Sequence, residues 1–148
     1  MSGPAHPQLL VSPCGEHGEY QRVTPPTAGW EHLSFGARVL NRGEAWEADS
    51  GDYEYGLVIL GGVASVYSSR GDWPRIGRRT DVFGGMPYGL YLPPKTRFRV
   101  QAESDRLDFA YGWAAAKGLH PPRLVTPEDA AVEIRGGGNA TRQINSIF

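Results

Sequence analysis

The stretch that decides the fold is residues 81–102, with the sequence DVFGGMPYGLYLPPKTRFRVQA. The short apolar run at residues 90–92 predicts a buried strand, and the alternation of apolar and polar side chains at residues 97–102 predicts a second one. The apolar side chains of that second strand are Phe98, Val100 and Ala102. The proline pair at 93–94 separates the two strands, because proline lacks the N–H that a sheet ladder needs and belongs at strand ends. A strand, a diproline corner and a second strand together predict a small antiparallel barrel.

The composition is that of one ordinary globular domain. Of the 148 residues, 40% are hydrophobic and 21% charged, and the 20 glycines and 12 prolines favour short strands joined by turns. A formal net charge of −1 gives no electrostatic reason to expect a nucleic-acid or membrane partner. Cys14 is the single cysteine, so no intrachain disulfide can form, and residues 1–7 lack the basic and apolar regions of a signal peptide. These features predict a cytoplasmic protein.

Three segments are predicted along the chain. Residues 1–29 are rich in proline and glycine and are expected to form an irregular N-terminal arm, with at most one short strand near residues 8–11. Residues 30–134 are expected to form a single barrel. Residues 135–148 begin with a run of glycines and are expected to form a hinge and an extended C-terminal tail.

The pattern of apolar residues predicts the strands of the barrel. Residues 54–67 contain an apolar run, a Gly-Gly pair and a second run, which predicts a hairpin. Residues 68–80 are polar and predict a long exposed loop, and residues 107–113 alternate cleanly and predict a half-buried strand. Residues 31–41 predict another such strand, whose core face is expected to carry Leu33, Phe35, Ala37 and Val39.

The predicted fold class is therefore all-β, and the strand–corner–strand stretch resembles the second half of the cupin motif, a double-stranded β-helix or jelly-roll barrel. Cupin enzymes hold a divalent metal ion with histidines and a glutamate. Here the first motif would fall at residues 43–62, which contain no histidine, and Phe98 stands where the second motif has its histidine. The four histidines, none of which pair at ligand spacing, are His6, His17, His32 and His120. The sequence predicts no metal-binding, cofactor-binding or catalytic residue in this chain.

Four side chains are candidates for the lining of a sugar-sized pocket: Trp46, Glu54, Tyr91 and Phe98. Glu54 precedes the apolar strand and is the one acid near a ligand position of the first motif. The aromatic side chains are equally expected as fillers of the barrel core, so the pocket and core interpretations both stay open.

Three segments carry a more specific resemblance. They are GWEHLSF at residues 29–35, the DVFGGMP to LPP stretch at residues 81–94, and RGGGN followed by RQI at residues 135–144. On these residues the chain resembles the 5-deoxy-glucuronate isomerases of bacterial inositol breakdown and the related 4-deoxy-L-threo-5-hexosulose-uronate ketol-isomerases of pectin breakdown. The resemblance extends from about Glu19 to the last residue.

That resemblance implies a protein with two cupin barrels, in which the second barrel holds the divalent metal. The chain matches the family's metal-free first barrel, in agreement with the missing ligands. The implied family reaction is aldose–ketose isomerisation of 5-deoxy-glucuronate to 2-deoxy-5-keto-gluconate, a proton transfer between adjacent carbons beside a metal-polarised carbonyl. No catalytic or metal-binding residue of the family carries over to any position in this chain.

Three hypotheses follow. The chain is an isomerase-like protein of myo-inositol catabolism that is inactive without a second barrel, a non-catalytic cupin module for binding or assembly, or the product of a truncated gene. The expected small-molecule partner is a sugar acid. A homodimer is also expected, because the arm and the tail leave strand edges and apolar groups available for a second copy.

Overall fold

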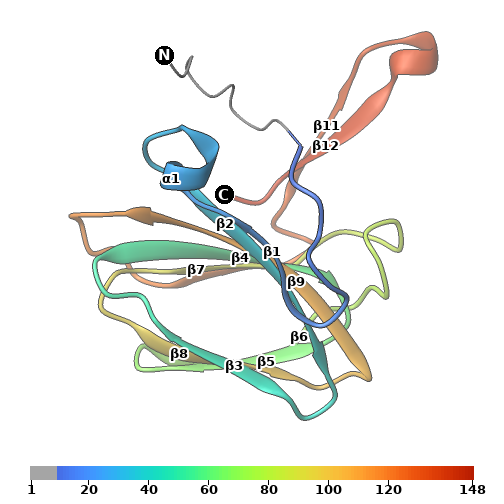
Figure 1. Ribbon diagram of the computed structural model, residues 1–148. Coiled ribbons are helices and arrows are strands. Elements are labelled where there is room, and N and C mark those ends of the chain that lie inside the picture. Colours follow the sequence, from blue (N-terminus) through green and yellow to red (C-terminus); the bar gives the residue numbers. More distant parts are fainter. Residues whose placement is uncertain (1–9) are drawn as a thin grey trace, which may run out of the picture.

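The computed structural model describes residues 10–148, and two antiparallel sheets face each other in it (Figure 1). The larger sheet has the strand order β1-β2-β9-β4-β7-β10, and the smaller sheet has the order β3-β8-β5-β6. In chain order the strands are β1 (Gly18–Val23), β2 (Ser34–Asn41), β3 (Ala45–Asp49), β4 (Tyr53–Gly61), β5 (Ala64–Ser68), β6 (Gly71–Ile76), β7 (Gly89–Leu92), β8 (Arg97–Ala102), β9 (Arg106–Ala115) and β10 (Arg123–Val125). The predicted all-β jelly-roll class is confirmed.

The core lies between the two sheets and is apolar. Its largest fully buried side chains are Phe109, Leu57, Leu90, Leu92 and Leu107. Burial of apolar surface of this kind is the main favourable contribution to folding, at roughly 25 cal/mol per Å². The central strands are stabilised because they place such side chains in the gap between the sheets.

The diproline corner carries the chain from one sheet to the other. The strand before it, β7, belongs to the six-stranded sheet, and the strand after it, β8, belongs to the four-stranded sheet. The carbonyl oxygen of Pro93 accepts hydrogen bonds from two buried hydroxyls, those of Ser50 (3.0 Å) and Thr96 (2.8 Å). The corner is therefore held in place by satisfied polar groups as well as by proline stiffness. The predicted burial of Phe98, Val100 and Ala102 is confirmed.

The core face predicted for β2 is wrong. Arg38 pairs with Phe109 and Leu40 pairs with Leu107, and residues directly opposite each other in a ladder project to the same face. The inner face of β2 therefore carries Ser34, Gly36, Arg38 and Leu40. Val39 is nevertheless buried, on the outer face, where it lies near residues 13–20. Because both faces of β2 are covered, simple alternation cannot identify the inner one.

The N-terminal arm is shorter and more regular than predicted. Residues 1–9 lie outside the described part of the chain, which includes most of the expected strand near 8–11, and Leu10 and Val11 are not in a strand. Instead, β1 pairs with β2 and forms an edge of the six-stranded sheet, so the barrel begins at Gly18 rather than at residue 30. The correction has a physical reason: β1 is stabilised by pairing with a strand ten residues further on, which its own short pattern does not reveal.

The hairpin predicted for residues 54–67 is also wrong. Strand β4 pairs with β7 and β9, whereas β5 pairs with β6 and β8, so Gly61 and Gly62 carry the chain between the two sheets. The exposed loop predicted for residues 68–80 contains strand β6, which forms the true hairpin with β5. Pro74 lies within β6 and is tolerated because β6 is an edge strand.

The C-terminal tail folds back on itself. Strands β11 (Ala131–Arg135) and β12 (Arg142–Ser146) form a hairpin that projects from the barrel (red in Figure 1), so the predicted boundary at residue 135 falls at its turn end. After β12, Ile147 and Phe148 return to the outer face of the six-stranded sheet. There Gly56 and Gly89 leave room for them, since a Cβ atom on Gly89 would lie 2.2 Å from Ile147 Cγ2.

Helices contribute little to the fold. The four-residue α1 (Pro25–Ala28) begins with two prolines, whose fixed φ suits the first helical positions, and a 3₁₀ turn spans Gly138–Ala140. In residues 10–148 no helix has the length and apolar character needed to cross a membrane.

Candidate functional site

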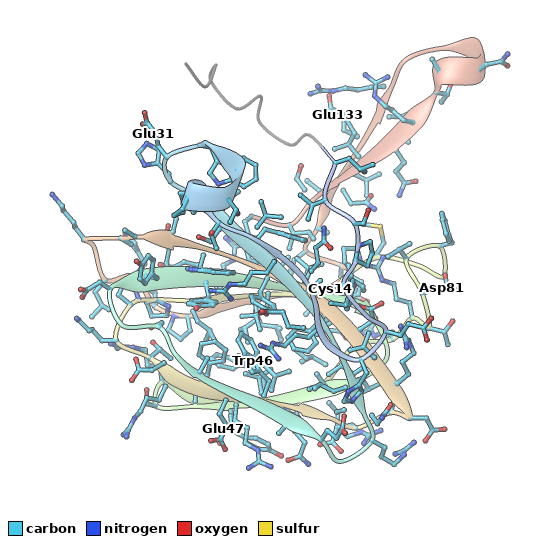
Figure 2. All side chains as sticks on the ribbon, in the orientation of Figure 1. Cys14, Glu31, Trp46, Glu47, Asp81 and Glu133 are labelled. Carbon is cyan, nitrogen blue, oxygen red and sulfur yellow. The ribbon has the colours of Figure 1, made fainter. Side chains whose placement is uncertain are left out.

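Aromatic rings fill the space between the sheets where a cupin would hold its ligand. Trp46 projects inward from β3 and Phe98 from β8, and their ring centroids lie 5.5 Å apart at an interplanar angle of 85°. Trp46, which lies between the two sheets in Figure 2, also stacks on Tyr111 of β9, with ring centroids 4.5 Å apart. Edge-to-face and offset-stacked pairs of this kind add stability beyond the area they bury. This part of the interior is packed core.

The four candidate lining residues do not lie together. Trp46 and Phe98 face the interior, whereas Glu54 and Tyr91 lie on the outer face of the six-stranded sheet, because their neighbours in sequence take the inward positions. The Tyr91 hydroxyl donates to Glu54 Oε2 at 2.9 Å. The pKa of Tyr91 is raised to about 12, mainly by burial of the phenol and to a smaller extent by this hydrogen bond. Glu54 is therefore engaged on the far side of the sheet from the rings.

A polar network at one end of the barrel joins three side chains that the sequence did not single out. Glu19 Oε2 accepts hydrogen bonds from the Tyr111 hydroxyl at 2.5 Å and from Arg38 Nη2 at 3.2 Å, and Arg38 Nε donates to the same hydroxyl at 3.0 Å. The Arg38 guanidinium lies 4.8 Å from the Trp46 ring centroid, within range of a cation–π contact. The network therefore ties β1, β2 and β9 to the four-stranded sheet.

The phenol of Tyr111 stays protonated at neutral pH. Burial raises its pKa well above the usual value, and the hydrogen bond to Glu19 adds to that effect, while Arg38 opposes it. Glu19 reaches this network because the pairing of β1 with β2 shifts register between Glu19 and Gln21, which turns Glu19 inward. A bulge of this kind inside a segment rich in glycine and proline leaves no signal in the sequence pattern.

A pocket of about 500 Å³ opens at the same end of the barrel. Arg22 from β1, Ser34 from β2 and Trp113 from β9 line it, and Tyr53, Glu31 and His32 stand at its rim. The Arg22 guanidinium lies 5.0 Å from the centroid of the Trp113 ring. This cavity is referred to below as the mouth pocket.

A second depression, of about 570 Å³, lies on the outer face of the four-stranded sheet. Its lining mixes Tyr67 with charged side chains, among them Glu47 and Arg99, which form an ion pair at 3.3 Å. Figure 2 shows Glu47 pointing away from the barrel interior. An exposed ion pair on an open sheet face contributes little binding energy by itself.

The fold and the interior together define a cupin barrel, and comparison with known proteins identifies the family. The chain belongs to the KduI/IolB family, whose profile matches residues 9–148. A cupin protein from Bacteroides fragilis shares the fold at 15% identity, with a TM-score of 0.52 over 77% of this chain and 88% of that chain.

More similar proteins carry a more specific name. The 5-deoxy-glucuronate isomerase of Geobacillus thermodenitrificans (strain NG80-2) is 40% identical over 134 residues, which cover 90% of this chain and 48% of that protein. The crystal structure of an IolB-like protein from Salmonella typhimurium LT2 has a TM-score of 0.91 and 36% identity, and the match covers 95% of this chain and 54% of that one. The chain spans about half the length of the curated relatives it matches. The resemblance predicted from the sequence is confirmed.

The residues present do not fit the divalent metal of catalytic cupins. In residues 10–148 no three His, Cys, Asp or Glu side chains lie close enough together to hold a metal ion. The inward positions of β3 and β8 carry Trp46, Ala48 and Phe98, which offer no oxygen or imidazole ligand. His6 lies outside the described residues, and His17 is engaged at 2.7 Å with Glu44 on the surface.

Proposed function

We propose that this chain is the metal-free cupin of a 5-deoxy-glucuronate isomerase, inactive by itself, and that turnover needs a metal-binding cupin in addition. The observation that carries this proposal is the interior formed by Trp46, Phe98 and Tyr111, which occupies the place of a cupin metal site with aromatic rings. The names of the relatives support the reaction, and their greater length supports the need for a second cupin.

The ionisable groups of the interior support the same proposal. Aldose–ketose isomerisation needs a base that moves a proton between adjacent carbons and a group that polarises the carbonyl. Glu19 accepts hydrogen bonds from Arg22, Arg38 and Tyr111 through one oxygen, so that oxygen is already occupied by donors of the chain itself. The raised pKa of Tyr111 likewise keeps its phenol from acting as a base at neutral pH.

An activity assay with 5-deoxy-glucuronate tests the proposal. We expect no turnover from the purified chain with added Zn²⁺, Mn²⁺ or Fe²⁺, and turnover once a chain carrying the second cupin of a relative is added. The second cupin alone is the control, and NMR of the sugar carbons measures the product. Turnover by this chain alone would contradict the inactive state, and no turnover in the mixture with any of the metals would contradict the isomerase assignment.

A cytoplasmic location is part of this proposal. Cys14 is the single cysteine and is exposed, and an unpaired exposed thiol is compatible with a reducing compartment.

Assembly as a homodimer is a second candidate function, favoured by apolar side chains outside the core. Val132 and Ile134 are exposed on the projecting hairpin, and Phe83 is 95% exposed on the loop between β6 and β7. Gln143 Nε2 lies 3.7 Å from Met86 Sδ, so the hairpin and this loop adjoin each other. Exposed apolar groups gathered in this way are typical of interfaces.

We expect sedimentation equilibrium at micromolar concentration to give the mass of a dimer, and Ile134→Ser to shift the protein toward monomer because it removes apolar contact area. Leu119→Ser is the matched control, since Leu119 and Ile134 are both 62% exposed but lie in different segments. A wild-type chain that sediments as a monomer would rule out this function.

A further inference from the structure

The mouth pocket gathers polar groups from strands that are distant in sequence. Arg22 lies near the end of β1, Ser34 begins β2, and Trp113 lies near the end of β9. These strands are neighbours in the six-stranded sheet and run antiparallel, so their ends meet at one edge of the barrel. The volume of about 500 Å³ falls within the range of roughly 300–1,000 Å³ that is usual for small-molecule sites.

Two donors that line this pocket have no acceptor within the described chain. Ser34 is 6% exposed and its hydroxyl makes no hydrogen bond to any residue in 10–148. The indole N–H of Trp113, a residue that is 9% exposed, likewise has no partner there. Neither donor is among the buried side-chain atoms of residues 10–148 that lack a partner, which are Gln21 Oε1 and Arg79 Nε, so both reach solvent and are open to a water or a ligand.

The charge at the inner wall of the pocket favours an anion. Arg22 and Arg38 share a single carboxylate, that of Glu19, at 3.3 Å and 3.2 Å. Glu19 also accepts from Tyr111, so the more exposed Arg22 keeps further N–H groups free to turn toward a ligand. Of these groups Arg22 is the one that lines the pocket itself, and it brings a positive charge to the inner wall.

The opposing charge at the rim is weak. Glu31 is 85% exposed at its side chain and lies 3.4 Å from His32 Nε2, and Figure 2 shows it projecting away from the barrel. A charge surrounded by water is screened by solvent and salt, so Glu31 repels an anion at the inner wall only slightly.

From these observations we infer that the mouth pocket binds a small hydroxylated carboxylate of the sugar-acid class. The ligand carboxylate pairs with Arg22, and the Ser34 hydroxyl and the Trp113 indole N–H donate to its oxygens. The need for a carboxylate follows from the pocket, whereas the choice of a sugar acid rests on the proposed function. This site uses neither a metal ion nor the packed rings of the interior.

An NMR titration of the full chain with D-glucuronate tests this inference, with the Trp113 indole N–H as the reporter. The signal is assigned by comparison with Trp113→Phe, since Trp30, Trp46 and Trp73 supply the other indole signals. We expect a saturable shift of the Trp113 signal with glucuronate and none with the neutral sugar D-glucose. An absence of saturable shift with glucuronate, or an equal shift with glucose, would overturn the inference.

Substitution of Arg22 tests whether this side chain binds the carboxylate of glucuronate. We expect Arg22→Gln to weaken glucuronate binding roughly tenfold or more, because a charge-assisted hydrogen bond is lost. Arg42→Gln is the matched control: Arg42 is also an exposed arginine paired with an acid, Asp105 at 2.8 Å, but it follows the opposite end of β2. Equal affinities for wild type and Arg22→Gln would overturn the assigned contact.

The titration and the isomerase assay separate the two proposals. Turnover in the two-cupin mixture together with no binding of glucuronate to this chain would overturn the mouth pocket alone. Binding with no turnover in the mixture would overturn the isomerase assignment and leave the pocket in place.

Discussion

Phe98→Ala is expected to lower the free energy of unfolding by roughly 3–5 kcal/mol, the usual cost of truncating a buried phenylalanine. Phe98 is 4% exposed and makes edge-to-face contacts with Trp46 and Tyr55, at centroid distances of 5.5 Å and 5.3 Å. Truncation to alanine removes both ring contacts and leaves a cavity between the sheets that a packed interior cannot fill by relaxation.

Urea denaturation measured by tryptophan fluorescence gives the change. Phe83→Ala is the matched control, because the same substitution at a side chain that is 95% exposed is expected to change stability by less than about 0.5 kcal/mol. Equal stabilities of Phe98→Ala and wild type would show that the ring is not part of the core. That result would reopen the interpretation of Phe98 as the lining of a pocket.

Gly62→Ala is expected to destabilise the protein more than an ordinary glycine replacement does. Gly62 has a φ of +94°, a backbone conformation that costs a residue with a Cβ about 1–2 kcal/mol. A Cβ atom there would also lie 2.3 Å from the carbonyl oxygen of Arg106, which is backbone and cannot move aside cheaply. The close approach exists because Gly62 is where the chain passes from one sheet to the other.

Gly43→Ala separates the effect of backbone strain from the effect of close contact with the Arg106 carbonyl oxygen. Gly43 has a φ of +83°, but a Cβ atom there would meet nothing within 4 Å. We expect this variant to lose about 1 kcal/mol from backbone strain, and Gly62→Ala to lose at least 1–3 kcal/mol more, the usual cost of overpacking. Thermal and urea unfolding of both variants measure the difference. Similar losses in the two variants would mean that contact with Arg106 is unimportant.

The substitution at Phe98 also bears on function. If Phe98→Ala lowers the stability as expected, the rings of Trp46 and Phe98 are part of the packed core, and the interior of this barrel has a structural role. In the proposed function, isomerase chemistry depends on a second cupin, and the binding proposed for this chain lies in the mouth pocket beside Arg22.

The sequence by itself was sufficient where one face of a strand is buried and the other is not. Residues 97–102 alternate cleanly, and the structure buries Phe98, Val100 and Ala102 as expected. The diproline corner was equally predictable, because proline restricts its own backbone wherever it stands. The lack of histidine at the inward positions also follows from the sequence, and so does the family, since both depend on residue identity.

Only the tertiary structure decided which strands pair and which face of a doubly covered strand is inward. Alternation could not show that Arg38 and Leu40, rather than Ala37 and Val39, line the interior of β2. Nor could it place β4 and β5 in different sheets, because pairing depends on long-range contacts that leave no local pattern.

The same limit applies to the sites. The sequence grouped Glu54 and Tyr91 with Trp46 and Phe98 as candidates for one pocket. Successive side chains of a strand point to opposite faces, and Glu54 and Tyr91 fall on the outer face of the six-stranded sheet. The network of Glu19 with Arg38 was hidden, because a bulge in β1 turns Glu19 inward. Residue identity therefore determined that the inward positions of β3 and β8 carry no histidine. The register of the strands determined which side chains meet, because side-chain direction in a sheet changes with every residue.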